Sequence, residues 1–451
     1  MKLQRLLILT VLIIFVVSSF VVSAFAQSQG LTVIRDQETE DALYSYTRPM
    51  FIAGSLNPDT LQIYLVKDSS INAFTTKGSI IFINTGLITS ADSVGEVIGV
   101  LAHETGHIVG GHLARLYDNM KIAQRNSLIS TILGGVASIA AGRPDVGMAV
   151  MMGGELASMM SHLAYRQGEE NAADAIATKI LDRTKYSSLG FLRMMQRLVK
   201  QEKIALSQDY YSYLRTHPLS EERVKFLTNH ALTEKYTDDS AHPEAEQSFQ
   251  RIKAKLIAFL IEPYRTLLLY DKDDKSIAAR YARAIAYYRM SDLDKALALM
   301  NELIKENPTD PYFYELKGQM LFEHGRIAEA LAPYEKAASL APKANLIGTS
   351  YAGVLIETGK AENAKKAIKI LEKVLLTEKD ESDVWRLLAS AANITGDEAL
   401  KAFAMAEYNF LIGNIEGAKV QIKRAEQLIP KKSAKYLILM DLKAELESLE
   451  N

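Results

Sequence analysis

Residues 96–115 read EVIGVLAHETGHIVGGHLAR and contain two histidines four positions apart, His103 and His107, with Glu104 directly after the first. The apolar residues before the histidines recur mostly at three- and four-residue steps, which predicts that the stretch lies on a helix. Side chains four residues apart on a helix lie about 40° apart in projection, so both imidazoles can bind one ion. The stretch therefore predicts a metal site built on a helix.

These three side chains have the chemistry of a zinc hydrolase. Neutral imidazoles suit zinc, which lowers the pKa of a bound water toward ~7. Glu104 lies about 100° round the helix from His103, where its carboxylate can hold that water, take its proton and later pass the proton to a leaving amine. We therefore expect one Zn²⁺ per chain, with His103 and His107 as ligands and Glu104 as the catalytic base.

A catalytic zinc needs a third protein ligand and one open position. His112 is five residues after His107, about 140° away from the ligand face of the helix, and we do not expect it to bind the metal. A stronger candidate lies in YRQGEENAADAIATKI, residues 165–180, where Glu170 and Asp174 stand four apart on a predicted helix. The first of these would be the third ligand, and the second would accept the outer N–H of a zinc-bound histidine.

Spacing leaves two alternatives open for this acidic segment. Glu169 competes with Glu170 for the ligand position, and an acidic helix face in solvent would also explain both residues. Ala172 and Ala173 favour the buried interpretation, because small side chains let this helix pack tightly against the first one.

A small sheet is predicted ahead of the histidine helix. Three β-rich runs, at 61–66, 71–76 and 79–84, are separated by turn-forming residues and predict an antiparallel sheet. Within the second run, Asn72, Ala73 and Phe74 are a candidate edge strand. An extended peptide can bind such an edge by main-chain hydrogen bonds, so we expect these residues to bind substrate.

From about residue 270 the chain repeats with a period of 34 residues. Small residues at the helix crossing, a large residue beside them and a closing proline form the tetratricopeptide pattern. Two units show it at Ala284, Tyr287, Ala296, Met300, Leu303 and Pro308, and at Gly318, Leu321, Ala330, Tyr334, Ala337 and Pro342. A third unit is predicted to carry three extra residues before Ala367, and a last helix from about residue 434 caps the stack. The array predicts one superhelix with a concave groove.

The first 26 residues indicate export. Lys2 and Arg5 precede an apolar run over 6–22, and Ala24-x-Ala26 ends it, which is typical of a Sec signal peptide cleaved after Ala26. An uncleaved anchor is the alternative, because about 17 apolar residues can nearly span a bilayer. The chain has no cysteine, which favours a bacterial periplasm over a disulfide-rich extracellular milieu.

The predicted division of the chain is a signal peptide at 1–26, a metallopeptidase domain at 27–265 and a repeat domain at 266–451. Within the peptidase domain, 128–165 is rich in glycine and methionine and holds two short apolar stretches. A buried helical hairpin is the simpler interpretation. The alternative is a Met-rich flap that covers the active site or contacts membrane or unfolded clients.

The run NAF…G…IFINTGLI…VLAHETGHIVGGH…ENAADAIAT…HPLSEERV resembles the gluzincin family that contains the CAAX prenyl proteases and the periplasmic β-barrel assembly-enhancing proteases. With a leader in front and repeats behind, the chain is most similar to the second group. The resemblance covers essentially all of the mature chain. It implies an α+β zincin-type metallopeptidase domain, mainly helical with a small antiparallel sheet, followed by an all-α tetratricopeptide superhelix.

The resemblance also implies roles for individual side chains. The E-x-x-A-D element of the family falls on Glu170 and Asp174, which favours Glu170 as the third zinc ligand. Its His-Pro element falls on His217 and the proline after it, and a basic residue further on falls on Arg223. In the family that histidine stabilises the transition-state oxyanion or caps zinc as a reversible fourth ligand, and either role suits the chemistry.

The motif and the leader predict a periplasmic zinc endopeptidase. The resemblance implies that it cleaves misfolded or misassembled outer-membrane β-barrel proteins, with repeats that dock substrate or the β-barrel assembly machinery. The alternative is a chaperone or assembly scaffold whose metal site is largely closed by His217. A weaker hypothesis, a membrane-embedded protease, needs spans that 128–160 is too short and too often interrupted by glycine to supply. The formal net charge of −2 predicts no nucleic-acid partner, and peripheral membrane contact is compatible with the sequence.

Overall fold

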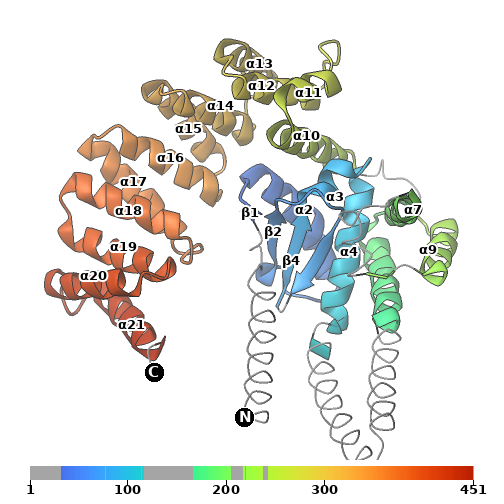
Figure 1. Cartoon of the computed structure of the whole chain (residues 1–451), viewed down its shortest axis with the longest axis horizontal. Helices are drawn as coiled ribbons and strands as arrows, with labels where there is room; N and C mark the ends of the chain where they lie inside the picture. The colour runs from blue at the N-terminus through green and yellow to red at the C-terminus, as the bar shows by residue number, and fades with distance from the viewer. Residues whose placement is uncertain are drawn as a thin grey trace, which may run out of the picture.

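The chain forms a mixed N-terminal part followed by an all-helical arc that curves round one side of it (Figure 1). The computed structural model describes residues 32–76, 78–112, 114–115, 166–204, 217–218, 220–236 and 242–449. The predicted signal peptide and the Gly/Met-rich 128–160 segment lie outside these residues. Over the residues that are described, no helix is both long and apolar enough to cross a membrane.

The N-terminal part contains one four-stranded sheet. Its strands are β1 (Val33–Ile34), β2 (Gln62–Val66), β3 (Ala73–Thr76) and β4 (Ile80–Asn84), in the order β1-β2-β4-β3. The three predicted strands are therefore confirmed. The prediction of an antiparallel sheet is wrong for one pair, because β2 and β4 run parallel while β1·β2 and β3·β4 are antiparallel.

The order of the strands follows from their burial. The apolar strands β2 and β4 take the two central positions, whereas β3 ends in two threonines and lies at the edge. After β2 the chain passes to this far edge before it forms β3, and the β3–β4 hairpin then brings β4 back beside β2. Gly78 lies in that hairpin with φ +95°, a conformation that favours glycine.

The rest of the described N-terminal part is mainly helical, and two of its helices, α4 (Val94–Gly110) and the helix over 166–184, carry the predicted metal ligands. The others are α2 (Gln37–Ala53), α3 (Thr85–Ser90), α7 (Leu189–Ile204), α9 (Glu221–Thr233) and α10 (Pro243–Leu260). Helix α4 is the predicted histidine helix, and it is buried along its first thirteen residues, 94–106. A Cβ at Gly99 would lie 2.3 Å from the Cβ of Phe191 on α7. A Cβ at Gly106 would lie 2.6 Å from the carbonyl oxygen of Ala173, so the 166–184 helix contacts α4 backbone to backbone.

The arc consists of helices stacked in sequence order (Figure 1). They are α11 (Pro263–Leu269), α12 (Ile277–Arg289), α13 (Leu293–Glu306), α14 (Pro311–Glu323), α15 (Ile327–Leu340), α16 (Asn345–Glu357), α17 (Ala361–Val374), α18 (Ser382–Thr395), α19 (Glu398–Leu411), α20 (Ile415–Leu428) and α21 (Ala434–Leu449). The residues that defined the first two predicted units are mostly buried between neighbouring helices, which confirms the tetratricopeptide pattern.

The three extra residues of the third unit do not lie where the sequence pattern put them. Helix α17 starts 34 residues after α15, so Ala364 is the counterpart of Ala330, and both side chains are fully buried. The extra residues lie in the loop to the next helix, which spans 375–381, whereas the preceding loop of this kind spans 341–344. An alanine recurs three residues later in α17, at Ala367, which is why the pattern alone misplaced the insertion.

A buried charge network joins the first turn of α2 to α10 and to the repeats. Lys255 Nζ lies 2.5 Å from Asp36 Oδ1 and 3.2 Å from Glu38 Oε2. Tyr281 of α12 donates a hydrogen bond of 2.8 Å to Glu38, and Arg251 of α10 pairs with the same carboxylate. Burial disfavours the ammonium form, but Asp36 and the other negative groups raise the pKa of Lys255 well above its ordinary value. The lysine therefore stays charged and holds α10 against the first turn of α2, while the hydrogen bond from Tyr281 to Glu38 links α2 to the repeats.

Replacing Lys255 with methionine is expected to lower the free energy of unfolding by about 3–5 kcal/mol, because the Asp36 carboxylate would lose its ammonium partner, while Glu38 would keep Arg251 as its cationic partner. Urea unfolding followed by fluorescence of Trp385, the single tryptophan, measures the loss. Lys295→Met is the control, since this lysine is 63% exposed and its pair with Asp292 is screened by water, so its loss should leave the stability close to that of the wild type. Equal stability of the wild type and the Lys255 variant would contradict a stabilising role for the network.

Candidate metal centre

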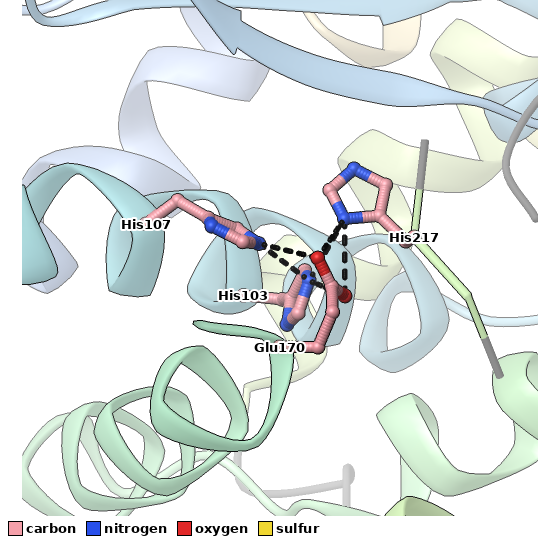
Figure 2. A group of neighbouring side chains, drawn as sticks. All are labelled: His103, His107, Glu170 and His217. Carbon is pink, nitrogen blue, oxygen red and sulfur yellow. Dashed lines mark hydrogen bonds and ion pairs between the residues drawn. The ribbon is translucent and has the colours of Figure 1, made fainter. Parts of the chain in front are cut away.

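Helix α4 brings the two predicted histidine ligands to one point. The Nε2 atoms of His103 and His107 lie 3.0 Å apart, and both face the 166–184 helix (Figure 2). His103 is fully buried, and Glu104 beside it is fully buried as well. Because α4 is held by close backbone contacts on two sides, these side chains project from a rigid element.

Two further groups complete the cluster that Figure 2 shows. Glu170 Oε2 lies 3.3 Å from His103 Nε2, and Glu170 Oε1 lies 3.4 Å from His107 Nε2. His217 Nδ1 lies 3.1 Å from Glu170 Oε1 and 3.3 Å from His103 Nε2. One donor atom from each of the four residues lies within 4.8 Å of the others.

The spacing of these donor atoms fits a tetrahedral zinc ion. Zinc binds imidazole nitrogen and carboxylate oxygen at about 2.0–2.2 Å, so tetrahedral neighbours are about 3.3–3.5 Å apart. Five distances between donor atoms of His103, His107, Glu170 and His217 run from 3.0 to 3.4 Å. Three nitrogens and one carboxylate oxygen are also the donor types that zinc prefers.

The charges of the cluster favour a bound cation. Burial opposes ionisation of Glu170, but hydrogen bonds from His103, His107 and His217 hold the pKa of this carboxyl far below its ordinary value. Burial likewise opposes a charge on His103, yet Asp174 and Glu170 raise its pKa to about 9. Burial, together with the nearby His103, lowers the pKa of His107 and the pKa of His217, so these two imidazoles stay neutral beside the Glu170 carboxylate and can donate lone pairs to a cation.

Asp174 and Arg223 support the cluster from outside. Asp174 Oδ1 lies 2.9 Å from His103 Nδ1, the ring nitrogen that points away from the other donors. Arg223 donates two hydrogen bonds to Asp174, of 2.7 and 2.9 Å, and its Nη1 lies 2.8 Å from Glu170 Oε2. The same Nη1 donates to the carbonyl oxygen of Pro218, next to His217. One buried guanidinium therefore orients both Glu170 and the segment that carries His217.

Arg223 was predicted as a site residue only from the resemblance to the family, and its contact with Glu170 was not predicted. A local signal does exist, because the Ser220 side chain caps α9 and accepts a hydrogen bond from the Arg223 amide. This cap fixes the arginine in the first turn of α9, from where its side chain reaches inward.

Glu104 lies beside the cluster but is not one of its four donors. Its Oε1 is 3.4 Å from His217 Nε2, and both carboxylate oxygens are buried with no hydrogen bond to a described side chain. Burial raises the pKa of Glu104 to about 7, although His107 and His103 oppose this shift. A carboxyl with such a pKa, and with oxygens free to bind a water, suits general base and acid chemistry near neutral pH.

Of the candidate substrate-binding residues, Ala73 and Phe74 lie on the edge strand β3 next to α4, and Asn72 directly precedes it. Within the described residues β3 pairs only with β4, so its other side offers backbone groups to an added strand. The Phe74 ring, in contrast, stacks on Phe82 at 5.1 Å between ring centroids, and Asn72 and Ala73 are buried. Any substrate contact made here would therefore use the main chain of β3 more than these three side chains.

A second set of metal-type side chains in the described part of the chain has a structural explanation. Asp182, His230 and Glu234 approach one another on α9 and the end of the 166–184 helix. Both Glu234 oxygens accept hydrogen bonds from Ser187 and Ser188, which lie directly before α7. The carboxylate joins two helix ends, so the group does not resemble the four-donor cluster.

Comparisons with known proteins agree with this arrangement. Residues 37–231 match the family profile described as Peptidase family M48, and residues 290–416 match the Cytochrome c-type biogenesis protein H TPR domain. A Beta-barrel assembly-enhancing protease of Yersinia pestis is 26% identical over 363 residues, which are 79% of this chain and 72% of that protein. The protein of the same name from Escherichia coli strain K12 is 24% identical over 374 residues, again 79% and 72%. Protease HtpX of Legionella pneumophila strain Corby is 26% identical over 215 residues, 43% of this chain and 69% of that protein.

Proposed function

We propose that this chain, a metallopeptidase with a peptidase family M48 domain at residues 37–231 and tetratricopeptide repeats behind it, is a periplasmic zinc endopeptidase for misfolded or misassembled outer-membrane β-barrel proteins. The observation that carries the proposal is the four-donor cluster with a buried glutamate beside it. The relatives that match along most of the chain are named for β-barrel assembly, which supports this substrate class.

His103, His107 and Glu170 would hold the zinc ion, which supplies a polarised water and an electrophile for the scissile carbonyl. The Glu104 carboxylate then takes a proton from the attacking water and delivers it to the nitrogen of the leaving amine. Asp174 keeps the outer nitrogen of His103 protonated, so that Nε2 offers its lone pair to the metal. The buried pocket keeps these charged groups away from bulk water, where the electrostatic interactions between them would be weaker.

Unfolded or strand-like segments fit the site better than folded surfaces do. Strand β3 lies beside α4 at the edge of the sheet, so an extended peptide could pair with it and cross the catalytic centre. A β-barrel strand that has failed to pair has the exposed main chain that such an interaction needs. We propose Asn72, Ala73 and Phe74 as the substrate-binding segment in this main-chain sense.

The repeats would dock the substrate or the β-barrel assembly machinery. A cavity of about 620 Å³ lies between α2, α10 and the inner face of the repeats. Its lining includes both signs of charge, from Arg35, Asp36, Lys255, Glu315, Asp383 and Arg386.

We retain 27–265 and 266–451 as the bounds of the two domains, and a cleaved leader at 1–26 as the export signal.

A second function, a chaperone or assembly scaffold with a latent metal site, is favoured by the position of His217. Its Nδ1 stands among the other three donors, in the place where a catalytic zinc would hold its water. A site with four protein ligands is closed and does not hydrolyse. We propose that His217 is a reversible cap, so that the chain acts as a scaffold when capped and as a peptidase when His217 withdraws.

Replacing His217 with alanine is expected to raise kcat for peptide cleavage by about tenfold, which corresponds to removing about 1.4 kcal/mol of competition by the imidazole for the water position. The measurement is cleavage of a quenched fluorescent peptide by zinc-loaded protein. His230→Ala is the matched control, because this histidine lies outside the four-donor cluster. A large fall in kcat with zinc retained would instead assign His217 to the oxyanion.

The substrate class is tested with one outer-membrane β-barrel protein in two forms. The zinc-loaded protein is incubated with the unfolded barrel, freshly diluted from urea into buffer, and separately with the same barrel folded in lipid vesicles. We expect cleavage of the unfolded form only, and none after removal of zinc with a chelator. Equal cleavage of both forms, or cleavage that survives the chelator, would refute the proposal.

A further inference from the structure

His112 folds back from the end of α4 onto a metal-binding histidine. The helix ends at Gly110, and Gly111 adopts the left-handed conformation with φ +65°, which interrupts the helix directly before His112. The His112 ring then lies against His107, with Nδ1 of one ring 2.9 Å from Nδ1 of the other and the ring planes at 84°. His112 is only 4% exposed, so this contact is part of the interior.

The metal-binding cluster determines which ring nitrogen carries the proton in His107 and in His112. His107 Nε2 faces His103 and Glu170, and it must carry a lone pair there to bind a metal. In a neutral imidazole the proton then sits on Nδ1, and this N–H points at His112 Nδ1. His112 must therefore accept through Nδ1, which makes it a neutral ring with its own proton on Nε2.

We infer that His112 is a positioning residue, which fixes the tautomer and ring orientation of His107 as Asp174 does for His103. The inference rests on the metal site of the proposed function. Each metal-binding histidine would then have an outer partner of its own, a carboxylate for His103 and an imidazole for His107. Such outer partners orient the ligand and raise its basicity, and their loss typically weakens metal binding about 10- to 100-fold.

Several contacts hold His112 in this position. A Cβ on Gly110 would lie 2.2 Å from His112 Nε2, so the ring fits only because this residue is glycine. Arg115 donates a hydrogen bond of 2.6 Å to the Gly110 carbonyl and pairs with Glu169 at 2.9 Å. Glu169 directly precedes the ligand Glu170 in the chain; its Oε2 lies 3.5 Å from His112 Nδ1 and makes no hydrogen bond there, because that nitrogen carries a lone pair. The end of α4 and the start of the 166–184 helix are thus tied together around the His107–His112 pair.

Metal affinity tests the inference without relying on cleavage. Co²⁺ is titrated into metal-free protein against a competing chelator, and its visible absorption reports the coordination geometry. We expect His112→Ala to weaken Co²⁺ binding about 10- to 100-fold and to change the spectrum. His112→Asn should recover part of both, because its amide oxygen can accept the His107 N–H.

Gly110→Ala offers a test that keeps the histidine. Gly110 is helical, so alanine suits its backbone, but the added methyl group would displace the His112 ring and should reproduce the effect of His112→Ala. Gly168→Ala is the matched control, because a Cβ there meets nothing within 4 Å although the residue lies two positions from Glu170. Thermal unfolding of all variants checks that the fold is retained.

The outcomes separate this inference from the proposed function. The positioning role is supported if His112→Ala and Gly110→Ala both bind Co²⁺ more weakly and with an altered spectrum. Gly168→Ala should then behave like the wild type. Wild-type affinity and spectrum in both of the first two variants would overturn that role and leave the metal site intact. A wild-type protein that binds no Co²⁺ or Zn²⁺ would overturn the proposed function together with the inference.

Discussion

Glu104→Gln lowers kcat for cleavage of an unfolded polypeptide by about 10²–10⁴-fold, the contribution usual for a positioned general base. Glutamine keeps the size of the side chain and can still hold a water, but its amide cannot take the proton. The Glu104 side chain is fully buried and is not one of the four clustered donors, so the substitution should leave the metal bound. Cleavage rate and metal content are measured on the same preparation.

The matched control for this experiment is Glu221→Gln, which changes a glutamate that is 94% exposed at the start of α9. Its cleavage rate should equal that of the wild type. The two candidate functions separate in cells that lack the protein. If Glu104→Gln rescues such cells as well as the wild type does, the scaffold function is the important one, whereas failure to rescue supports the peptidase.

Glu170→Gln is expected to weaken zinc binding by more than the roughly 100-fold that loss of an outer partner causes, because it removes an anionic ligand from the ion itself. The buried site would also keep Arg223, whose Nη1 now lies 2.8 Å from the Glu170 carboxylate, without that negative partner. Zinc content after dialysis against a chelator measures the change. We expect about one zinc per wild-type chain and almost none in the variant.

The neighbouring variant Glu169→Gln provides the control for the ligand assignment. Glu169 pairs with Arg115 and lies outside the four-donor cluster, so its loss should weaken zinc binding far less than the loss of Glu170 does. Loss of zinc from this variant, with zinc retained by Glu170→Gln, would reverse the assignment of the third ligand.

Local patterns in the sequence predicted the elements that carry the chemistry. The helical period around His103 and His107 places both imidazoles on one face because that geometry depends only on residues four apart. The strands and the tetratricopeptide helices follow from the same kind of short-range periodicity. The choice between Glu169 and Glu170 could not follow from spacing, since it depends on which side of the 166–184 helix faces α4.

The extra residues of the third repeat show a similar limit. Ala364 and Ala367 are both small and both buried, so either could mark the helix crossing in a sequence alignment of the units. The loop that absorbs the insertion is identified only when the helix ends are known. The parallel pairing of β2 with β4 is another case, because alternation of apolar residues does not specify the direction of the neighbouring strand.

The amino-acid order thus specified a zinc-type motif on a helix, an acidic partner segment, a small sheet and an array of helical repeats. Contacts between distant segments specified the rest: Glu170 and His217 beside the two histidines, Arg223 across Asp174 and Glu170, and Lys255 between Asp36 and Glu38. The physical reason is the range of the interactions. Helical and strand periods are set by neighbours in the chain, whereas a buried charge is stable only where packing brings it an opposite charge from another element.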